Sequence, residues 1–124
     1  MLVVSGTSIM LTRGNTAELL IEPVDEESYP YMLSDGEKVI FTVKNAKGVI
    51  VIQKVLKADN QNQETGEIGL IISPEDTINL AETEYKYDVL LVTESGDAYT
   101  FIESSTFSVV SAIGTYKDVG GGGP

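Results

Sequence analysis

This chain of 124 residues contains no cysteine, no histidine and no tryptophan. Without cysteine, a disulfide-stapled scaffold and thiol catalysis are both excluded. Without histidine, the chain lacks the residue used most often as a general base and as a transition-metal ligand, so a Ser-His-Asp or Cys-His device cannot be assembled within it. We therefore expect no catalytic residue, no enzyme activity, no metal and no cofactor.

Basic residues are also scarce, because eight lysines and arginines face 19 aspartates and glutamates, which gives a net charge of −11. Phosphate backbones and anionic lipid surfaces repel such a chain, so we expect no nucleic-acid binding and no membrane binding. The acidity suits solubility or docking to a basic protein surface.

Long apolar runs are absent, and no segment approaches the roughly 20 apolar residues that a membrane helix requires. The opening Met-Leu-Val-Val-Ser has no basic region and a short apolar run, so we expect no signal peptide. The length suits one domain, which we place at residues 1–112. Residues 113–124 end in Gly-Gly-Gly-Gly-Pro and are typical of a flexible tail.

Short apolar segments separated by polar turns make up most of the sequence. Gly14 and Asn15 tolerate positive φ and separate residues 7–12 from 16–22, which predicts a β-hairpin or a strand-to-strand corner. Residues 45–48, Asn-Ala-Lys-Gly, predict a hairpin turn. Apolar residues alternate in the segments that follow, with Val39, Phe41, Val43, Ile68, Leu70, Ile72, Tyr85, Tyr87, Val89 and Leu91 on the expected inner faces.

The pattern predicts an all-β, immunoglobulin-like β-sandwich of about seven antiparallel strands, with a small barrel as the alternative. Ser73 and Pro74 suit the N-cap and first position of a helix, so one short helical turn is expected near residues 74–79. Tyr85 or Tyr87 resembles the corner tyrosine of immunoglobulin-like and fibronectin-type domains, whose hydroxyl bonds an upstream backbone group. Gly69 marks either a bulge or a close backbone approach, and residues 103–105 mark a bulge or a bend in the last strand.

Two segments are candidates for contact with a partner chain. Residues 49–52 are apolar on both faces, which indicates either a central strand covered on both sides or a strand that contacts another chain. Residues 23–36 form a long acidic connection with two prolines, either a solvated crossover between the sheets or a functional loop. In that connection, Tyr29 and Tyr31 could anchor an interface or form a small core under the loop.

Arg13 is the only arginine. It could clamp a carboxylate of a partner, or it could neutralise acids of its own domain such as Glu18 or Glu103. Residues 59–64, Asp-Asn-Gln-Asn-Gln-Glu, are spaced like the start of a calcium loop, but Glu64 replaces the required glycine and Leu70 the final acid, so no metal site is expected. The remaining acids lie mostly on turns, so a glycosidase pair is not expected.

The order of motifs resembles the N-terminal domain of phage baseplate upper proteins and related small tail proteins of Firmicute prophages. The pattern Ile-Met-Leu-Thr-Arg-Gly-Asn-Thr at residues 9–16 resembles their opening strand and turn. Residues 39–44 and 50–54 resemble the strands that follow the acidic connection, and residues 66–77 and 85–89 resemble the segment leading to a tyrosine-bearing strand. The resemblance covers residues 7–110.

This resemblance implies an immunoglobulin-like virion protein, made in the bacterial host cytoplasm, that acts through protein–protein contacts in a phage tail or baseplate, or in a phage-like particle. It implies other tail proteins as partners, and a homo-oligomer is a further possibility. The chain ends near residue 124, without the long C-terminal region through which baseplate upper proteins carry receptor-binding parts. The alternative is a carbohydrate-binding or host-adhesion sandwich.

Overall fold

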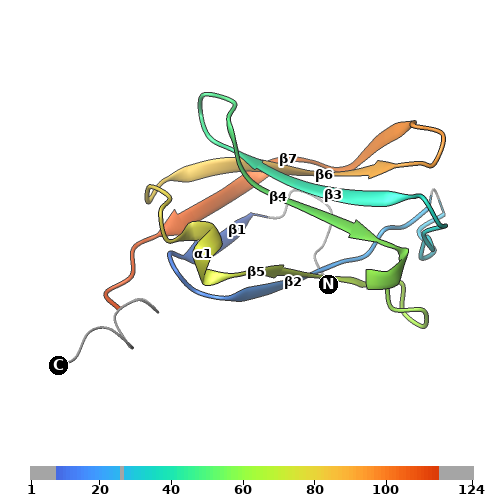
Figure 1. Ribbon diagram of the computed structural model, residues 1–124, viewed down its shortest axis with the longest axis horizontal. Coiled ribbons are helices and arrows are strands. Elements are labelled where there is room, and N and C mark those ends of the chain that lie inside the picture. Colours follow the sequence, from blue (N-terminus) through green and yellow to red (C-terminus); the bar gives the residue numbers. More distant parts are fainter. Residues whose placement is uncertain (1–7, 26, 115–124) are drawn as a thin grey trace.

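Seven β-strands build two facing sheets in this computed structural model (Figure 1). The structure describes residues 8–25 and 27–114, so the expectations about a signal peptide and about most of the Gly-rich tail concern residues outside these ranges. In chain order the elements are β1 (Ile9–Thr12), β2 (Ala17–Ile21), β3 (Lys38–Lys44), β4 (Ile50–Lys57), a 3₁₀ turn (Ala58–Asn60), β5 (Ile68–Ile72), α1 (Pro74–Thr77), β6 (Glu84–Val92) and β7 (Ala98–Val110). The predicted sandwich and its helical turn are confirmed, whereas the 3₁₀ turn is not among the expected elements.

The larger sheet has the strand order β1-β7-β6-β3-β4, and the smaller sheet pairs β2 with β5. Every neighbouring pair is antiparallel except β1 and β7, which run parallel, so the expectation of antiparallel strands throughout is wrong for this pair. The reason is that the chain changes sheets directly after β1, which leaves β1 to join the far edge beside the last strand. The placement of β3, β6 and β7 in one sheet and of β2 and β5 in the other is that of immunoglobulin-like domains.

The change of sheets takes place at Arg13 and Gly14. Gly14 has a φ of 80°, a left-handed conformation that favours glycine, and the Asn15 amide donates to the Thr12 carbonyl at 3.1 Å. Because β1 pairs with β7 and β2 with β5, this turn is a corner between sheets rather than a hairpin. The corner alternative is therefore confirmed.

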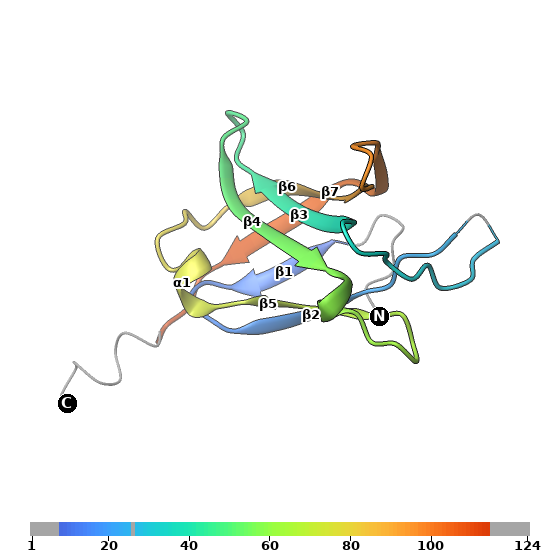
Figure 2. The same cartoon turned by 45° about the vertical axis from the view of Figure 1, so that its right-hand side comes forward.

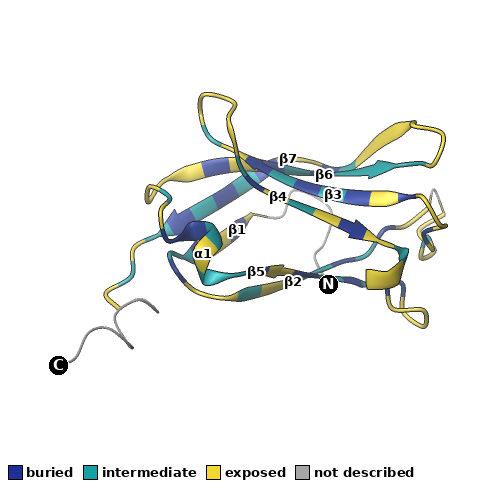
Figure 3. Ribbon diagram, viewed as in Figure 1, coloured by how far each residue is buried: buried dark blue, intermediate teal, exposed yellow. Residues whose placement is uncertain are grey.

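The core lies between the sheets and follows the predicted alternation. Buried positions on β3, β5 and β6 repeat every second residue, as the dark segments in Figure 3 show. At its centre, the ring of Phe41 lies 5.3 Å from that of Tyr87 and 6.3 Å from that of Phe107, measured between centroids. Of the predicted inner residues on these strands, only Leu91 is partly exposed, near the end of β6.

Local sequence signals also predict a turn and the start of a helix correctly. Gly48 has a φ of 80° and donates its amide to the Asn45 carbonyl at 2.9 Å, which closes the predicted hairpin. Ser73 is the N-cap of α1, and its amide donates to the carboxylate of Asp76 at 2.8 Å. The register of β6 and β7 shifts opposite Glu103, as expected for a bulge, but Gly69 pairs regularly with Leu20, so a bulge at that position is wrong.

The strand β4 is an edge strand of the larger sheet. The interpretation of residues 49–52 as part of a central, doubly covered strand is therefore wrong. Val49 and Ile50 are about half exposed, whereas Ile52 is buried.

Lys54 of β4 is partly buried and forms an ion pair with Asp76 of α1 at 2.8 Å. Burial alone would raise the pKa of Asp76, but bonds from Lys54 and Ser73 hold it below its usual value.

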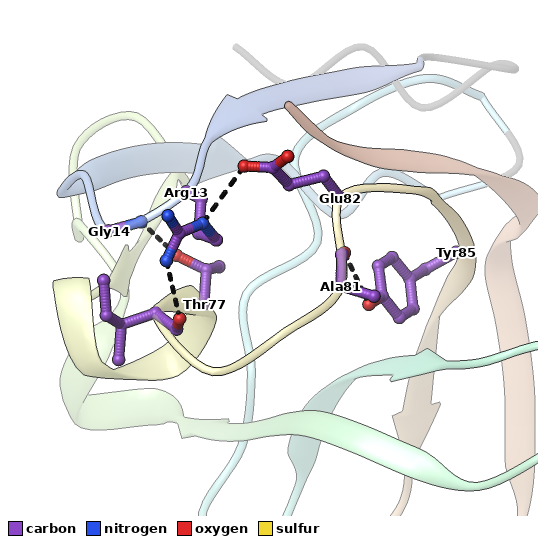
Figure 4. A network of polar contacts seen from close by, with 7 residues as sticks. Arg13, Gly14, Thr77, Ala81, Glu82 and Tyr85 are labelled. Atoms are coloured by element: carbon purple, nitrogen blue, oxygen red, sulfur yellow. Dashed lines mark hydrogen bonds and ion pairs between the residues drawn. The ribbon is translucent and has the colours of Figure 1, made fainter. Parts of the chain in front are cut away.

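Tyr85 is the corner tyrosine. Its hydroxyl donates to the Ala81 carbonyl at 2.8 Å, within the crossover that leads into β6 (Figure 4). Tyr87 instead packs its ring against Phe41 and Phe107 in the core. The structure thus decides between the two candidates, and the predicted bond to the crossover is confirmed.

Replacing Tyr85 with phenylalanine should lower the free energy of unfolding by about 1 kcal/mol, because the Ala81 carbonyl loses its partner. The melting temperature should fall by roughly 4 °C. Tyr29→Phe is the matched control, since its ring is 64% exposed. Equal melting temperatures for the two variants would show that the corner bond contributes nothing.

Candidate functional site

The three residues singled out by sequence do not come together. Arg13 belongs to the corner between β1 and β2, beside α1, whereas Tyr29 and Tyr31 belong to the connection between β2 and β3. These segments lie at opposite ends of the sandwich in both Figure 1 and Figure 2. The two ends therefore have to be considered separately.

At the first end, Arg13 holds the corner against the segment that precedes β6 (Figure 4). Its Nε forms an ion pair with Glu82 at 3.2 Å, and its Nη1 donates to the Ile78 carbonyl at 3.0 Å. The neighbouring Gly14 amide donates to the buried hydroxyl of Thr77 at 2.8 Å. The acid is thus Glu82 rather than Glu18 or Glu103. This geometry favours the internal role of Arg13 over that of a clamp for a partner.

At the second end, residues 23–31 form a small hairpin of their own. The Tyr31 amide donates to the Pro23 carbonyl at 2.9 Å. The carboxylate of Asp25 accepts bonds from the amides of Glu27 and Tyr29, at 2.8 and 3.0 Å. This turn chemistry presents the ring of Tyr29 to solvent, where it is 64% exposed.

Tyr31 is partly buried and packs against the core. Its hydroxyl donates to the buried carboxylate of Glu37 at 2.8 Å, and the same carboxylate accepts the Ser34 amide. This bond to Glu37, with some burial, raises the pKa of Tyr31 above its usual value. Each tyrosine therefore fits a different alternative: Tyr31 forms the small core under the loop, and Tyr29 is the exposed ring.

Gln61 is the anchor of this end that the sequence does not reveal. Its side chain is buried and joins two loops: Oε1 accepts the Leu33 amide, and Nε2 donates to the carbonyls of Tyr31 and Gly66, each at 2.8 Å. In the sequence it is one polar residue among many, between Asn60 and Asn62. No local signal distinguishes it, because its partners lie up to 30 residues away.

A groove of about 490 Å³ opens between this loop and the hairpin formed by β6 and β7. The hairpin extends beyond the smaller sheet at this end (Figure 1), so its inner side has no β-strand opposite it. Tyr99 pairs with Leu91, whose side of β6 also carries the buried residues Tyr87 and Val89. The lining includes Val24, Asp25, Glu27, Tyr31, Tyr99 and Phe101.

The groove lies between two loops that carry exposed aromatic rings. Both loops that form it connect strands of an immunoglobulin-like frame, and in variable domains the corresponding end carries the antigen-binding loops. Exposed aromatic rings offer large contact areas at low entropic cost, and Tyr29 and Tyr99 are 64% and 57% exposed. The carboxylate of Asp25 already accepts hydrogen bonds from two backbone amides, so it stabilises the turn.

In the segment at residues 59–64, the side-chain oxygens of Asn60 and Asn62 accept bonds from the local backbone. Asn60 accepts the Lys57 amide, and Asn62 accepts the amides of Glu64 and Thr65. Within residues 8–25 and 27–114, no group of three histidine, cysteine or acidic side chains is arranged to hold a metal ion. The same ranges contain no helix long and apolar enough to cross a membrane.

Calcium should leave stability unchanged, because the amide oxygens of Asn60 and Asn62 already serve the backbone. Thermal melts in excess calcium and in chelator should coincide. A ligand that binds only the native state must raise the melting temperature, so a calcium-dependent rise of several degrees would contradict this expectation.

Comparison with known proteins gives no family assignment. No protein-family model matches the chain, and no curated protein sequence matches it.

Proposed function

We propose that this chain is a non-enzymatic structural component of a phage tail or baseplate, or of a phage-like particle, that acts through protein–protein contacts. The observation that carries the proposal is the groove between residues 23–31 and the β6–β7 hairpin, with the exposed rings of Tyr29 and Tyr99 at its end of the sandwich. The order of motifs shared with small tail proteins supplies the setting.

The chemistry of this end indicates the kind of partner. Asp25, Glu27, Glu94 and Asp97 are exposed on the two loops, next to the two rings. We name this surface the acidic end, defined by these four acids with Tyr29 and Tyr99. An aromatic centre with a charged rim is typical of a docking surface, and the rim favours a basic partner.

The docking role predicts that Tyr29→Ala and Tyr99→Ala each weaken binding to the tail protein by about tenfold or more, because each removes an exposed aromatic contact. The fold should be retained, since both rings are largely solvent-exposed. Tyr31→Ala should also weaken docking, with a loss of stability as well, because its hydroxyl bonds Glu37. Co-purification with proteins encoded by neighbouring genes, quantified by titration, measures these effects.

The control for this experiment is Ile71→Ala, which removes a half-exposed apolar side chain from β5 in the other sheet. It should bind like the parent. A parent protein that binds no tail component would overturn the proposed function, and so would Tyr variants that bind as tightly as the parent.

A carbohydrate-binding module is the second candidate, and the groove lining favours it. Tyr31, Tyr99 and Phe101 supply aromatic surface, and Glu27 supplies a carboxylate that could accept bonds from sugar hydroxyls. The volume of about 490 Å³ is in the range of small-molecule sites. Glycan-array binding that depends on Tyr99 would favour this candidate over protein docking.

A further inference from the structure

Four lysines lie on the outer face of the larger sheet, although the chain has only eight basic residues and a net charge of −11. They are Lys38 and Lys44 on β3, Lys57 on β4 and Lys86 on β6, and all four are exposed. Each alternates with buried neighbours, so the period of the strands directs them away from the core. On the outward positions of these three strands, the acids are Glu84 and Asp88.

The lysines are arranged as like-charged pairs. Lys38 lies directly opposite Lys57, and Lys44 lies directly opposite Lys86. Like charges in such cross-strand positions destabilise a sheet. In the described part of the chain none of the four forms an ion pair, and Lys86 donates only to the hydroxyl of Thr106, at 3.2 Å. A chain with 19 acidic residues has ample means to pair them.

Two rows of side chains lie between the two lysine pairs, a polar row of Thr42, Gln53 and Asp88 and an apolar row. Ile40 of β3 is in register with Val55 of β4 on one side and with Leu90 of β6 on the other. Val55 is 48% exposed, and Ile40 and Leu90 are partly exposed. We name this surface the lysine face, defined by these three residues and the four lysines. An apolar centre with a charged rim has the anatomy of a protein interface.

The molecule itself carries the complementary surface. The acidic end presents four exposed acids and two exposed aromatic rings, which are complementary in charge and polarity to the four lysines and the apolar row. A two-fold contact between lysine faces would set lysine against lysine, so complementarity requires a heterologous contact, in which unlike surfaces meet.

We propose that the lysine face binds the acidic end of a second copy of this chain, so that copies assemble head to face. The inference rests on the docking role proposed for the acidic end and adds a second copy as its partner. This contact would offset the repulsion within the lysine pairs, because each pair is neutralised by acids of the neighbouring copy.

Sedimentation velocity over a concentration series tests the proposal. The parent protein should self-associate at low salt, and raising the salt from about 0.05 M to about 0.5 M should weaken the association severalfold, since the contact depends on charge. Lys44→Glu should weaken it as well. Lys47→Glu, on the turn outside the lysine face, is the matched control and should behave like the parent.

Two double variants test the two surfaces separately. Lys44→Glu with Lys86→Glu removes the net positive charge of the four lysines of the lysine face, and Glu27→Lys with Glu94→Lys removes the net negative charge of the acidic end without touching Asp25, which holds its turn. Each variant alone should be monomeric, because one of its two surfaces then lacks the charge that the contact requires. An equimolar mixture should associate into pairs, because the unaltered acidic end of the first variant meets the unaltered lysine face of the second.

Melting curves separate this outcome from misfolding. Lys44→Glu replaces a like-charged pair by an opposite-charged one, so it should melt at or above the temperature of the parent while it loses association. A monomeric parent at high concentration and low salt would overturn the inference, as would association that survives both reversals or a mixture that stays monomeric.

The outcomes also separate this inference from the proposed function. A monomeric parent that still binds a tail protein through Tyr29 overturns the head-to-face contact alone. Self-association through the lysine face, with no binding to any tail protein, overturns the tail role alone.

Discussion

Gln61→Ala should lower the free energy of unfolding by about 3 kcal/mol, because three backbone groups lose their partner at once. They are the amide of Leu33 and the carbonyls of Tyr31 and Gly66, and Gln61 itself is only 5% exposed. The melting temperature should fall by roughly 10 °C. Urea unfolding followed by circular dichroism measures the change.

The neighbouring exposed residue provides the control. Gln63→Ala should change the free energy of unfolding by less than about 0.5 kcal/mol, as for an ordinary surface position. Gln61→Glu should be at least as destabilising as Gln61→Ala, because a carboxylate cannot donate to the two carbonyls and its charge would be buried. If Gln61→Ala and Gln63→Ala unfold alike, the two loops are not held together as described.

Gly66→Ala should lower the free energy of unfolding by about 2–3 kcal/mol for two reasons. Gly66 has a φ of 81°, which is unfavourable for a side chain, and an added Cβ would lie 2.8 Å from the Cβ of Pro30. The contact with Pro30 pushes on the turn that presents Tyr29. Binding to the tail protein should therefore weaken in this variant together with its stability.

Gly48→Ala isolates the first reason, the backbone strain. Gly48 has a φ of 80°, almost the same as Gly66, but an added Cβ would meet nothing within 4 Å. This control should cost only about 1–2 kcal/mol, from backbone strain alone. Equal losses for Gly48→Ala and Gly66→Ala would mean that the loop bearing Pro30 does not pack on Gly66.

Much of the fold follows from local sequence signals. The alternation at Val39, Phe41 and Val43 predicts an inward face because the side chains of a strand point to opposite sides with a period of two. Gly48 and the Ser73-Pro74 pair predict their turn and helix start through backbone constraints that act within a few residues. These signals require no knowledge of what the segment pairs with.

The parts that sequence reasoning misses depend on distant partners. The parallel pairing of Ile9 with Phe107 joins residues nearly the whole length of the chain apart, and no local pattern encodes its direction. The groove brings Tyr31 close to Tyr99, and Tyr99 stands out only once the hairpin is seen to extend past the smaller sheet. The opposition of Lys44 to Lys86 likewise requires the strand register.

At the candidate site too, the sequence identifies the residues but does not reveal their roles. Tyr29 and Tyr31 are identified from sequence because two tyrosines flank a proline in a long acidic connection. Their different roles follow from the turn geometry at Asp25 and from the buried carboxylate of Glu37, which the sequence does not place. Glu82, the ion-pair partner of Arg13, is separated from it by 69 residues.

The most direct test of the docking role is a map of backbone amide shifts by nuclear magnetic resonance. The labelled protein would be titrated with the proteins encoded by neighbouring genes. We expect one of these proteins to perturb residues 23–31 and 93–101, and Tyr29→Ala to weaken the effect. Perturbations confined to β2 and β5 would contradict the docking role. The docking role would also be contradicted if no neighbouring protein caused perturbations while a glycan shifted the same groove residues.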